Sequence, residues 1–289
     1  MIPSELDYVR PRSLSETLLL LQEHGEEGQI LAGGHTLLPL LKMRLAAPGL
    51  LIDIQDLYEL KGITFEENQI KIGAMTRHVD LQNSEALLRE WPVFSKAATQ
   101  IADIQVRNRG TIGGSLSAAD PSADWPAIIL MLDATIELQS TQGKRVLSAK
   151  DYFTGMLETA RNHDEILVEI NIPRNAKNKI TDYQKFRHPA SGYAIASVGT
   201  CLTLKDNKVE SARIAVSGVG EKAYLAKHAS AALESETITP DLIERASRLV
   251  TENVETLSDH FANEDYRKQL AYVMCRRALT YCSDSDRKQ

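Results

Sequence analysis

Two glycine-rich segments carry residue types that can hold phosphate groups. The first runs Leu31-Ala-Gly-Gly-His-Thr-Leu-Leu38 and follows a short apolar run. Glycine has no Cβ atom, so it reaches positive φ and lets a ligand touch the backbone. A strand that enters Gly33-Gly34 and leaves as a helix points several unpaired N–H groups one way, which suits an anion. The alternative is a plain tight turn that holds no ligand. The segment matches neither the P-loop nor the dinucleotide-binding fingerprint.

The second segment is Thr111-Ile-Gly-Gly-Ser115, followed by small and acidic residues up to Asp124. Its glycine pair lies among small side chains, so bulky atoms can rest against the backbone. Ser115 is a short hydrogen-bond donor, and Asp120 and Asp124 are acceptors for sugar or amide groups. A flexible loop is the alternative interpretation. Two such turns in one chain suit a ligand with two phosphates and a large planar head.

The spacing of apolar residues predicts the elements that position these segments. Ser13 and Glu16 have the form of a capping box, which predicts a helix over 13–23 that stops near Gly25. Strands at 29–32 and 50–54 with a helix at 37–45 alternate in the α/β manner. In the next unit we expect strands at 69–75, 134–139 and 165–172, and helices at 76–84 (capped by Thr76), 91–102 and 123–132.

A polar stretch at 174–179 has no periodicity, and we place a domain boundary there. Beyond it the pattern predicts strands at 182–186, 194–204 and 209–217, the last two joined as a hairpin at Asp206-Asn207. Helices are then expected over 222–233, 240–254 and 264–281. Strands followed by helices mark an α+β domain.

Composition limits the function further. The 289 residues allow roughly two domains. A net charge of −6 argues against a protein that grips nucleic acid. No apolar run reaches the ~20 residues of a membrane span. The start lacks a secretory signal, and three dispersed cysteines without a CxxC motif disfavour an iron–sulfur or zinc site. We expect a cytoplasmic protein with no metal of its own.

Three stretches resemble one known family. They are AGGHTLLPLLKMR at 32–44, QVRNRGTIGGSLSAADPSAD at 105–124 and YQKFRHPASGYA at 183–194. Together they are similar to the FAD-binding (medium) subunit of the molybdenum hydroxylases, the carbon monoxide dehydrogenase-like and xanthine dehydrogenase-like enzymes. The resemblance covers nearly the full chain. The paired motifs at this spacing are specific, whereas either one alone is weak.

The resemblance implies an α+β protein of two domains. A vanillyl-alcohol-oxidase-type (PCMH-type) FAD-binding domain would occupy residues 1–176, with α/β subdomains at about 1–57 and 58–176. The C-terminal domain, residues 177–289, would be α+β, with a three-stranded antiparallel sheet and a helical bundle, like that of the carbon monoxide dehydrogenase flavoprotein.

The resemblance also implies how FAD is held. Residues 31–38 and 111–115 would hold the pyrophosphate, and Asp124 would meet the polar adenosine side. Lys185, rather than the adjacent Gln184, would reach the flavin, where a cation stabilises the reduced form and raises the potential; the alternative is a surface lysine. The expected cofactor-binding residues are Leu31, Ala32, Gly33, Gly34, His35, Thr36, Leu37, Leu38, Ile101 (on the flavin ring), Thr111, Ile112, Gly113, Gly114, Ser115, Asp124, Leu167 (lining the site) and Lys185.

The resulting hypothesis is an electron-transfer flavoprotein subunit without a catalytic acid or base. A molybdopterin-containing large subunit would oxidise the substrate, and a small subunit with two [2Fe–2S] clusters would deliver electrons to the FAD. An acceptor such as NAD or a quinone would take them, in a heterotrimer or its dimer. The alternatives are a stand-alone flavin oxidoreductase of the same fold and a non-catalytic nucleotide-binding or assembly protein. The chain lacks the cysteine-rich insertion of some members, and Ser115 stands where many have asparagine.

Four further side chains allow two interpretations each. His188 and Tyr193 flank the Lys185 segment, and they either approach the flavin or belong to a hairpin. Arg107 and Arg109 either neutralise phosphate or point to solvent.

Overall fold

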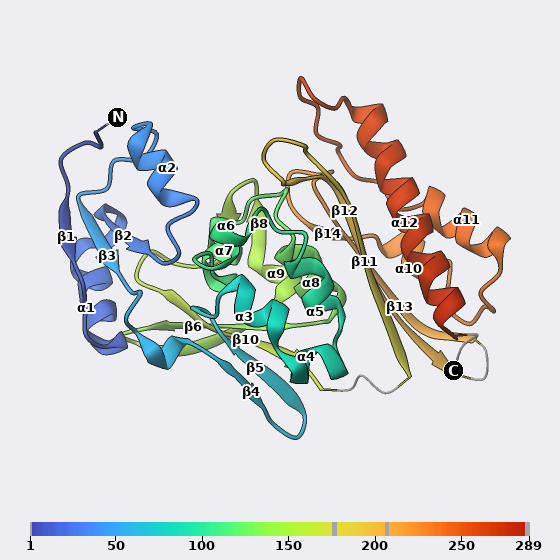
Figure 1. The fold of residues 1–289 in the computed structure, drawn as a ribbon, viewed down its shortest axis with the longest axis horizontal. Helices are drawn as coiled ribbons and strands as arrows, with labels where there is room; N and C mark the ends of the chain where they lie inside the picture. The colour runs from blue at the N-terminus through green and yellow to red at the C-terminus, as the bar shows by residue number, and fades with distance from the viewer. Residues whose placement is uncertain (1, 175–177, 206–207, 287–289) are drawn as a thin grey trace.

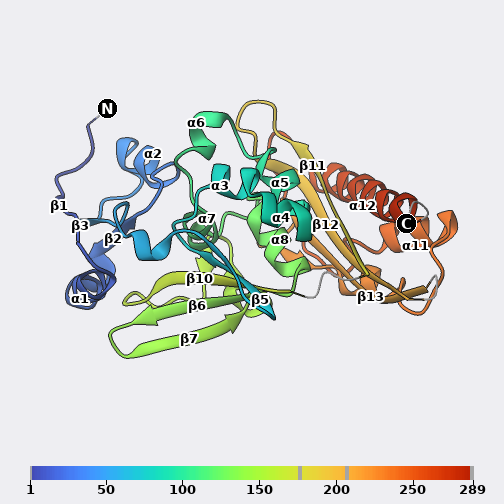
Figure 2. The ribbon, with the colours of Figure 1, turned by 60° about the horizontal axis from the view of Figure 1, so that its bottom comes forward.

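Three main β-sheets follow one another along the chain, each with its own helices (Figure 1). The computed structural model describes residues 2–174, 178–205 and 208–286. The first sheet lies at one end of the molecule, the second in the middle and the third at the other end, as Figures 1 and 2 both show.

The first sheet is parallel, in the order β1 (Asp7–Val9), β3 (Leu50–Asp53), β2 (Gly28–Leu31). Helix α1 (Leu14–His24) begins after Ser13, whose side chain accepts the N–H of Glu16, and a 3₁₀ turn (Gly25–Glu27) follows it. The predicted capping box is only half formed, because the carboxylate of Glu16 accepts from the backbone of Arg12 instead. Helix α2 (Leu37–Lys42) is shorter than the predicted 37–45, since Arg44 turns to a φ of 57°.

The second sheet is antiparallel and carries a helical layer. Its order is β4 (Ile63–Phe65), β5 (Gln69–Gly73), β10 (Ile166–Pro173), β6 (Thr135–Ser140), β7 (Gly143–Ser148), preceded by a 3₁₀ turn (Tyr58–Leu60). Between β5 and β6 lie α3 (His78–Asn83), α4 (Glu85–Glu90), α5 (Val93–Ala98), α6 (Ile104–Arg107), α7 (Ile112–Ala118) and α8 (Trp125–Met131). After β7 come α9 (Ala149–Tyr152), β8 (Phe153–Gly155) and β9 (Glu158–Thr159).

Thr76 does not cap α3, contrary to the expectation. Its hydroxyl instead exchanges hydrogen bonds of 3.0 Å with the backbone N–H and carbonyl of Gly62. Arg77 occupies the position before α3. The hydroxyl that was expected to cap α3 is therefore used in a tertiary contact.

The third sheet is antiparallel, with β11 (Lys179–Arg187), β12 (Ala194–Lys205), β13 (Lys208–Ser217) and β14 (Tyr224–Leu225) in that order. The three long strands match the expected three-stranded sheet, and the two-residue β14 adds a fourth. Helices α10 (Lys227–Ala231), α11 (Pro240–Arg248) and α12 (Glu264–Asp286) follow, and α12 packs along β11 and β12 (Figure 1). The expected hairpin residues 206–207 and part of the expected boundary, 175–177, lie outside the described residues.

The third sheet is packed between two sets of helices. On its other side it meets α5 and α8 of the middle unit. A Cβ atom on Gly199 of β12 would lie 2.7 Å from the sulfur of Met131, which shows how close this contact is. The large core around Trp125 therefore includes Tyr183 and Cys201 from the third sheet. Within the described residues, no helix combines the length and apolar character that a bilayer crossing requires.

Candidate functional site

The first glycine segment joins β2 to α2 and leaves a row of backbone donors unused. Gly34 has a φ of 77°, which an L side chain rarely adopts. The carbonyl of Gly34 accepts from Leu38, but within the described parts of the chain the N–H groups of residues 33–37 donate to no protein atom. Because these donors lie at the start of α2, the segment is suited to a phosphate.

The second glycine segment is not a turn, which corrects the interpretation made from sequence. Gly113 and Gly114 lie in the first turn of α7, after Thr111, whose hydroxyl accepts the N–H of Gly114 at 3.1 Å. The N–H of Gly113 donates to Ala74 O at 2.8 Å. A Cβ atom on Gly113 would lie 2.5 Å from the Cβ of Ala74, so this glycine permits close packing rather than a positive φ.

The two glycine segments nevertheless form one surface. A Cβ atom on Gly33 would lie 2.4 Å from the carbonyl oxygen of Arg109 and 2.8 Å from the Cα of Gly110. A Cβ atom on Gly114 would lie 3.5 Å from the Cβ of Ala32. Backbone therefore touches backbone where the segments meet, and only glycine at position 33 permits it.

A buried lysine lies among polar groups from both halves of the chain. The side chain of Lys185, in β11, is fully buried, which removes the alternative of a surface lysine. Its ammonium group donates to Asp124 at 2.9 Å and to the carbonyl of Gln100 at 3.1 Å. Tyr183 donates to the same carboxylate at 2.6 Å. Burial raises the pKa of Asp124, although Lys185 and Tyr183 act in the opposite direction.

The contact between Asp124 and Lys185 brings together two residues that were expected at different parts of FAD. From the resemblance we expected Asp124 at the adenosine side and Lys185 at the flavin. Their charged groups form an ion pair at 2.8 Å, so the two side chains lie at one place in this structure. Burial and the neighbouring carboxylate also raise the pKa of Tyr183 well above its ordinary value, so Tyr183 keeps its proton and remains a donor.

Two apolar residues expected at the flavin differ in access. Ile101 follows α5 and is half-buried against the large core. Leu167, in β10, is only 3% exposed and lies within that core. In this conformation Ile101 therefore offers more surface to a ligand than Leu167 does.

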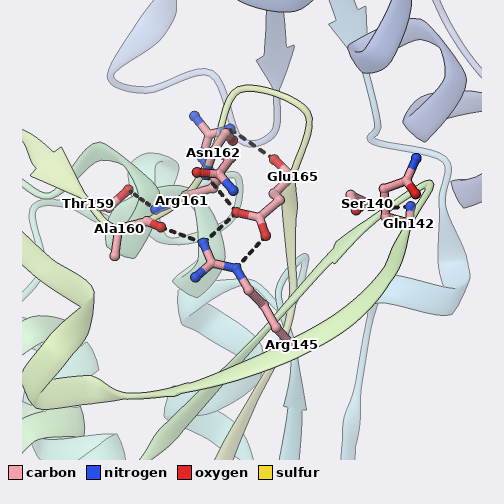
Figure 3. Close-up of polar contacts among 8 residues, drawn as sticks. All are labelled: Ser140, Gln142, Arg145, Thr159, Ala160, Arg161, Asn162 and Glu165. Atoms are coloured by element: carbon pink, nitrogen blue, oxygen red, sulfur yellow. Dashed lines mark hydrogen bonds and ion pairs between the residues drawn. The ribbon is translucent and has the colours of Figure 1, made fainter.

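Strand β10 is held at its start by a buried carboxylate (Figure 3). Glu165 accepts two hydrogen bonds from Arg145 and one, at 2.6 Å, from the backbone N–H of Asn162. Arg145 also donates to the carbonyl of Ala160. Burial alone would raise the pKa of Glu165, but the hydrogen bonds from Arg145 and Asn162 outweigh it and lower that pKa. The network fixes the loop that leads into Leu167.

Tyr193 lies nearer the first glycine segment than its sequence position suggests. It follows β11 in the loop that also contains His188, and its hydroxyl lies near the side chain of Thr36. Partial burial raises the pKa of Tyr193, and the carboxylate of Asp120 adds to this effect. The loop after β11 thus reaches the start of α2.

His78 was missed by the sequence analysis. It is almost fully buried, and its Nδ1 accepts the indole N–H of Trp125 at 3.0 Å. Burial lowers its pKa to about 4, and the nearby Arg107 adds to this shift, so the ring is neutral. A Cβ atom on Gly110 would lie 2.7 Å from its Nε2, so His78 supports the backbone that meets Gly33. Nothing in the spacing of the sequence marks this residue.

The other titratable groups of the described residues are not arranged as a metal site. Among the residues that the structure describes, no group of three or more histidine, cysteine or acidic side chains is placed to hold a metal ion. Cys201, Cys275 and Cys282 are buried free thiols. Burial raises the pKa of Cys275 and that of Cys282 to about 12, so both remain protonated.

Comparisons with known proteins cover almost the whole chain. The profile described as the FAD binding domain in molybdopterin dehydrogenase matches residues 4–175, and that of the CO dehydrogenase flavoprotein C-terminal domain matches residues 181–282. The glyceraldehyde dehydrogenase medium chain of Sulfolobus acidocaldarius is 36% identical, over 96% of this chain and 99% of that protein. The carbon monoxide dehydrogenase medium chain of Afipia carboxidovorans is 35% identical, over 96% and 97%.

Solved structures agree with this result. A chain of the carbon monoxide dehydrogenase from Hydrogenophaga pseudoflava superposes with a TM-score of 0.95 at 35% identity, covering 98% of each chain. The likeness therefore extends over the middle unit, the first sheet and the third sheet together.

Proposed function

The chain belongs to the FAD-binding medium subunits of the carbon monoxide dehydrogenase and xanthine dehydrogenase family, and we propose that it holds one FAD across the contact between residues 31–38 and 109–115. Membership makes it the FAD-binding component of an oxidoreductase. The position of the cofactor on this chain is the part that we infer.

The row of free N–H groups at residues 33–37 carries the proposal. A pyrophosphate needs several unpaired donors, and the start of α2 offers the N–H groups of residues 33–37, which have no protein acceptor among the described residues. The first turn of α7 offers no free backbone donor at residues 112–115, because each of these N–H groups already has a protein partner. We therefore assign the phosphates mainly to the first segment, with the hydroxyl of Ser115 as a neighbouring donor.

The buried ion pair is proposed to serve the flavin end. FAD when bound supplies the capacity to accept and release electrons singly or in pairs. Lys185 would place a positive charge near the ring, and Asp124 would offset part of it at 2.8 Å. The potential would thus be set by the pair rather than by a free lysine. Ile101 would contact the ring, and Leu167 would support that wall from the core.

The electron path through the complex is proposed from the family. We infer that a small subunit with [2Fe–2S] clusters delivers electrons to this chain and that a large subunit with molybdopterin oxidises the substrate. An acceptor such as NAD or a quinone would then take the electrons. Two medium chains of 35–36% identity and a subunit of a dehydrogenase complex at 34% identity support a place in such an assembly.

The experiment compares FAD binding by the full chain with that of two glycine variants. Gly33→Ala introduces a Cβ atom 2.4 Å from a backbone oxygen, so it should raise the FAD dissociation constant by about tenfold or more. Gly49→Ala is the matched control, because its Cβ atom would be 3.4 Å from the flexible side chain of Glu27. A visible flavin spectrum after removal of free FAD measures the loaded fraction.

If the isolated chain binds no FAD, co-expression with the partner subunits tests whether it binds FAD in the complex. A chain that holds no FAD alone but holds it in the complex would still support the proposal; in the complex the FAD is quantified after its release, because the [2Fe–2S] clusters also absorb visible light. A wild-type chain without FAD under both conditions would refute it, and so would a Gly33→Ala variant that binds FAD as tightly as the Gly49→Ala control.

A further inference from the structure

The turn after α5, residues 100–102, is held by two cationic side chains that come from different directions. Lys185 of β11 donates to the carbonyl of Gln100 at 3.1 Å. Arg107, at the end of α6, donates through one nitrogen to the carbonyls of Ile101 and Ala102 at 2.9 and 3.2 Å. Three consecutive carbonyls just beyond the end of α5 thus each accept from a cation.

The backbone of this turn is unusual in a way that needs support. Ala102 has a φ of 40°, a left-handed conformation that is unfavourable for a residue with a Cβ atom. Such a conformation persists only where the surroundings impose it, and it is found most often at ligand sites. Here the bonds from Arg107 hold both carbonyls beside the unusual peptide.

A third contact fixes the same turn from the loop after β11. Gly192 has a φ of 75°, and a Cβ atom placed on it would lie 3.3 Å from the Cα of Ala102. The loop that carries Tyr193 therefore rests on the turn that carries Ile101. The turn lies where α5, α6 and the end of β11 meet.

The side chain of Arg107 contacts this turn through one of its two terminal nitrogens. Its guanidinium bonds two carbonyls, while its Nε is buried without a partner in the described chain. A buried donor without a partner lowers the stability of the fold, so we expect the side chain to have a function that offsets this loss of stability. Its contacts indicate that this function is to hold Ile101 in position.

We propose that Arg107 is a positioning residue for the cofactor, which it serves by fixing the turn that presents Ile101 to the flavin. The inference rests on the proposed function, since it takes the FAD to lie against Ile101. Because the turn is ordered before the ligand arrives, binding loses less conformational freedom. Arg107 acts through the backbone of residues 101–102 and makes no bond to the flavin itself.

The test compares four variants of the full chain loaded with FAD, of which the fourth, Gly192→Ala, changes the loop that rests on the turn. Arg107→Met removes both bonds to the turn, and Arg107→Lys keeps a cation that can still bond a carbonyl. Arg89→Met is the control, because Arg89 is an exposed arginine of α4. The dissociation constant of FAD, the visible circular dichroism of the bound flavin and the melting temperature are measured for each.

We expect Arg107→Met to raise the dissociation constant about tenfold and to weaken the visible circular dichroism, because the ring loses a fixed wall. Arg107→Lys should restore most of both signals, and Arg89→Met should change neither. Gly192→Ala perturbs the same turn without touching Arg107, so it should weaken the circular dichroism even if Arg107→Met fails to fold.

The outcomes separate this inference from the proposed function. If Arg107→Met and Gly192→Ala both keep the dissociation constant and the circular dichroism of the wild type, the positioning role is overturned, even if their melting temperatures fall. A wild-type chain that takes up no FAD, alone or in its complex, would overturn the proposed function and this inference with it.

Discussion

The substitution Gly113→Ala sets two effects of known size against each other. Alanine inside a helix is favoured over glycine by about 0.5–1 kcal/mol. Its Cβ atom, however, would lie 2.5 Å from the Cβ of Ala74 and 2.7 Å from the Ala74 oxygen. Carbon atoms pack at about 3.5–4.0 Å, so the helix must move by about 1 Å.

Neither partner in this contact can move freely. The N–H of Gly113 bonds the carbonyl of Ala74, and the N–H of Ala74 in turn bonds Val168 of β10 at 2.9 Å. Overpacking of this kind costs about 1–3 kcal/mol, which exceeds the helix gain. We expect a net loss of about 1–2 kcal/mol, or a melting temperature lower by about 2–8 °C in a unit of this size.

Thermal unfolding and FAD binding would be measured on the same samples. Gly49→Ala supplies the control, because its new Cβ atom has only ordinary contacts. The displaced start of α7 should also lower FAD affinity, since Gly114 lies beside Ala32. An unchanged or higher melting temperature for Gly113→Ala would mean that helix propensity outweighs the overlap, and it would refute the reasoning.

Two further predictions concern buried charge. Lys185→Met leaves the Asp124 carboxylate without its cation, so it should lower the free energy of unfolding by about 3–5 kcal/mol, and Lys185→Met with Asp124→Asn should recover most of that loss. Denaturant melts check this, and equal stability of single and double variants would contradict it. Burial lowers the pKa of His78 from 6.5 to about 4. The neutral ring therefore leaves the free energy of unfolding undiminished above pH 6.5, and that free energy falls by up to about 3 kcal/mol as the pH drops toward 4. His78→Gln keeps an acceptor for Trp125, and its unfolding free energy should fall less than that of the wild type between pH 7 and 4; parallel curves would contradict the assignment.

Local signals in the sequence were sufficient for most of the regular elements. Ser13 and Gly25 bracket α1 as expected, because a side-chain cap and a positive-φ stop depend only on neighbours in the chain. The long strands of the third sheet followed from apolar runs between turn residues. Thr76 was misassigned, since its hydroxyl has a distant partner in Gly62.

The second glycine pair shows where local reasoning fails. Glycine at positions 113 and 114 suggested a turn, yet both residues are helical. The reason for the glycine at 113 is the closeness of Ala74, which is far away in sequence. A sequence reader sees the missing Cβ atom but not the neighbour that requires its absence.

The motifs alone determined the family, the cofactor class and the two segments that form the candidate site, because those properties reside in short runs of residues. The tertiary structure alone decided that Gly33 meets Gly110, that Lys185 is paired with Asp124, and that Arg107 bonds the turn at residues 101–102. Burial, ion pairing and close backbone contact arise between residues that folding brings together from distant parts of the chain. Their energies depend on that arrangement, so residue type cannot specify them in advance.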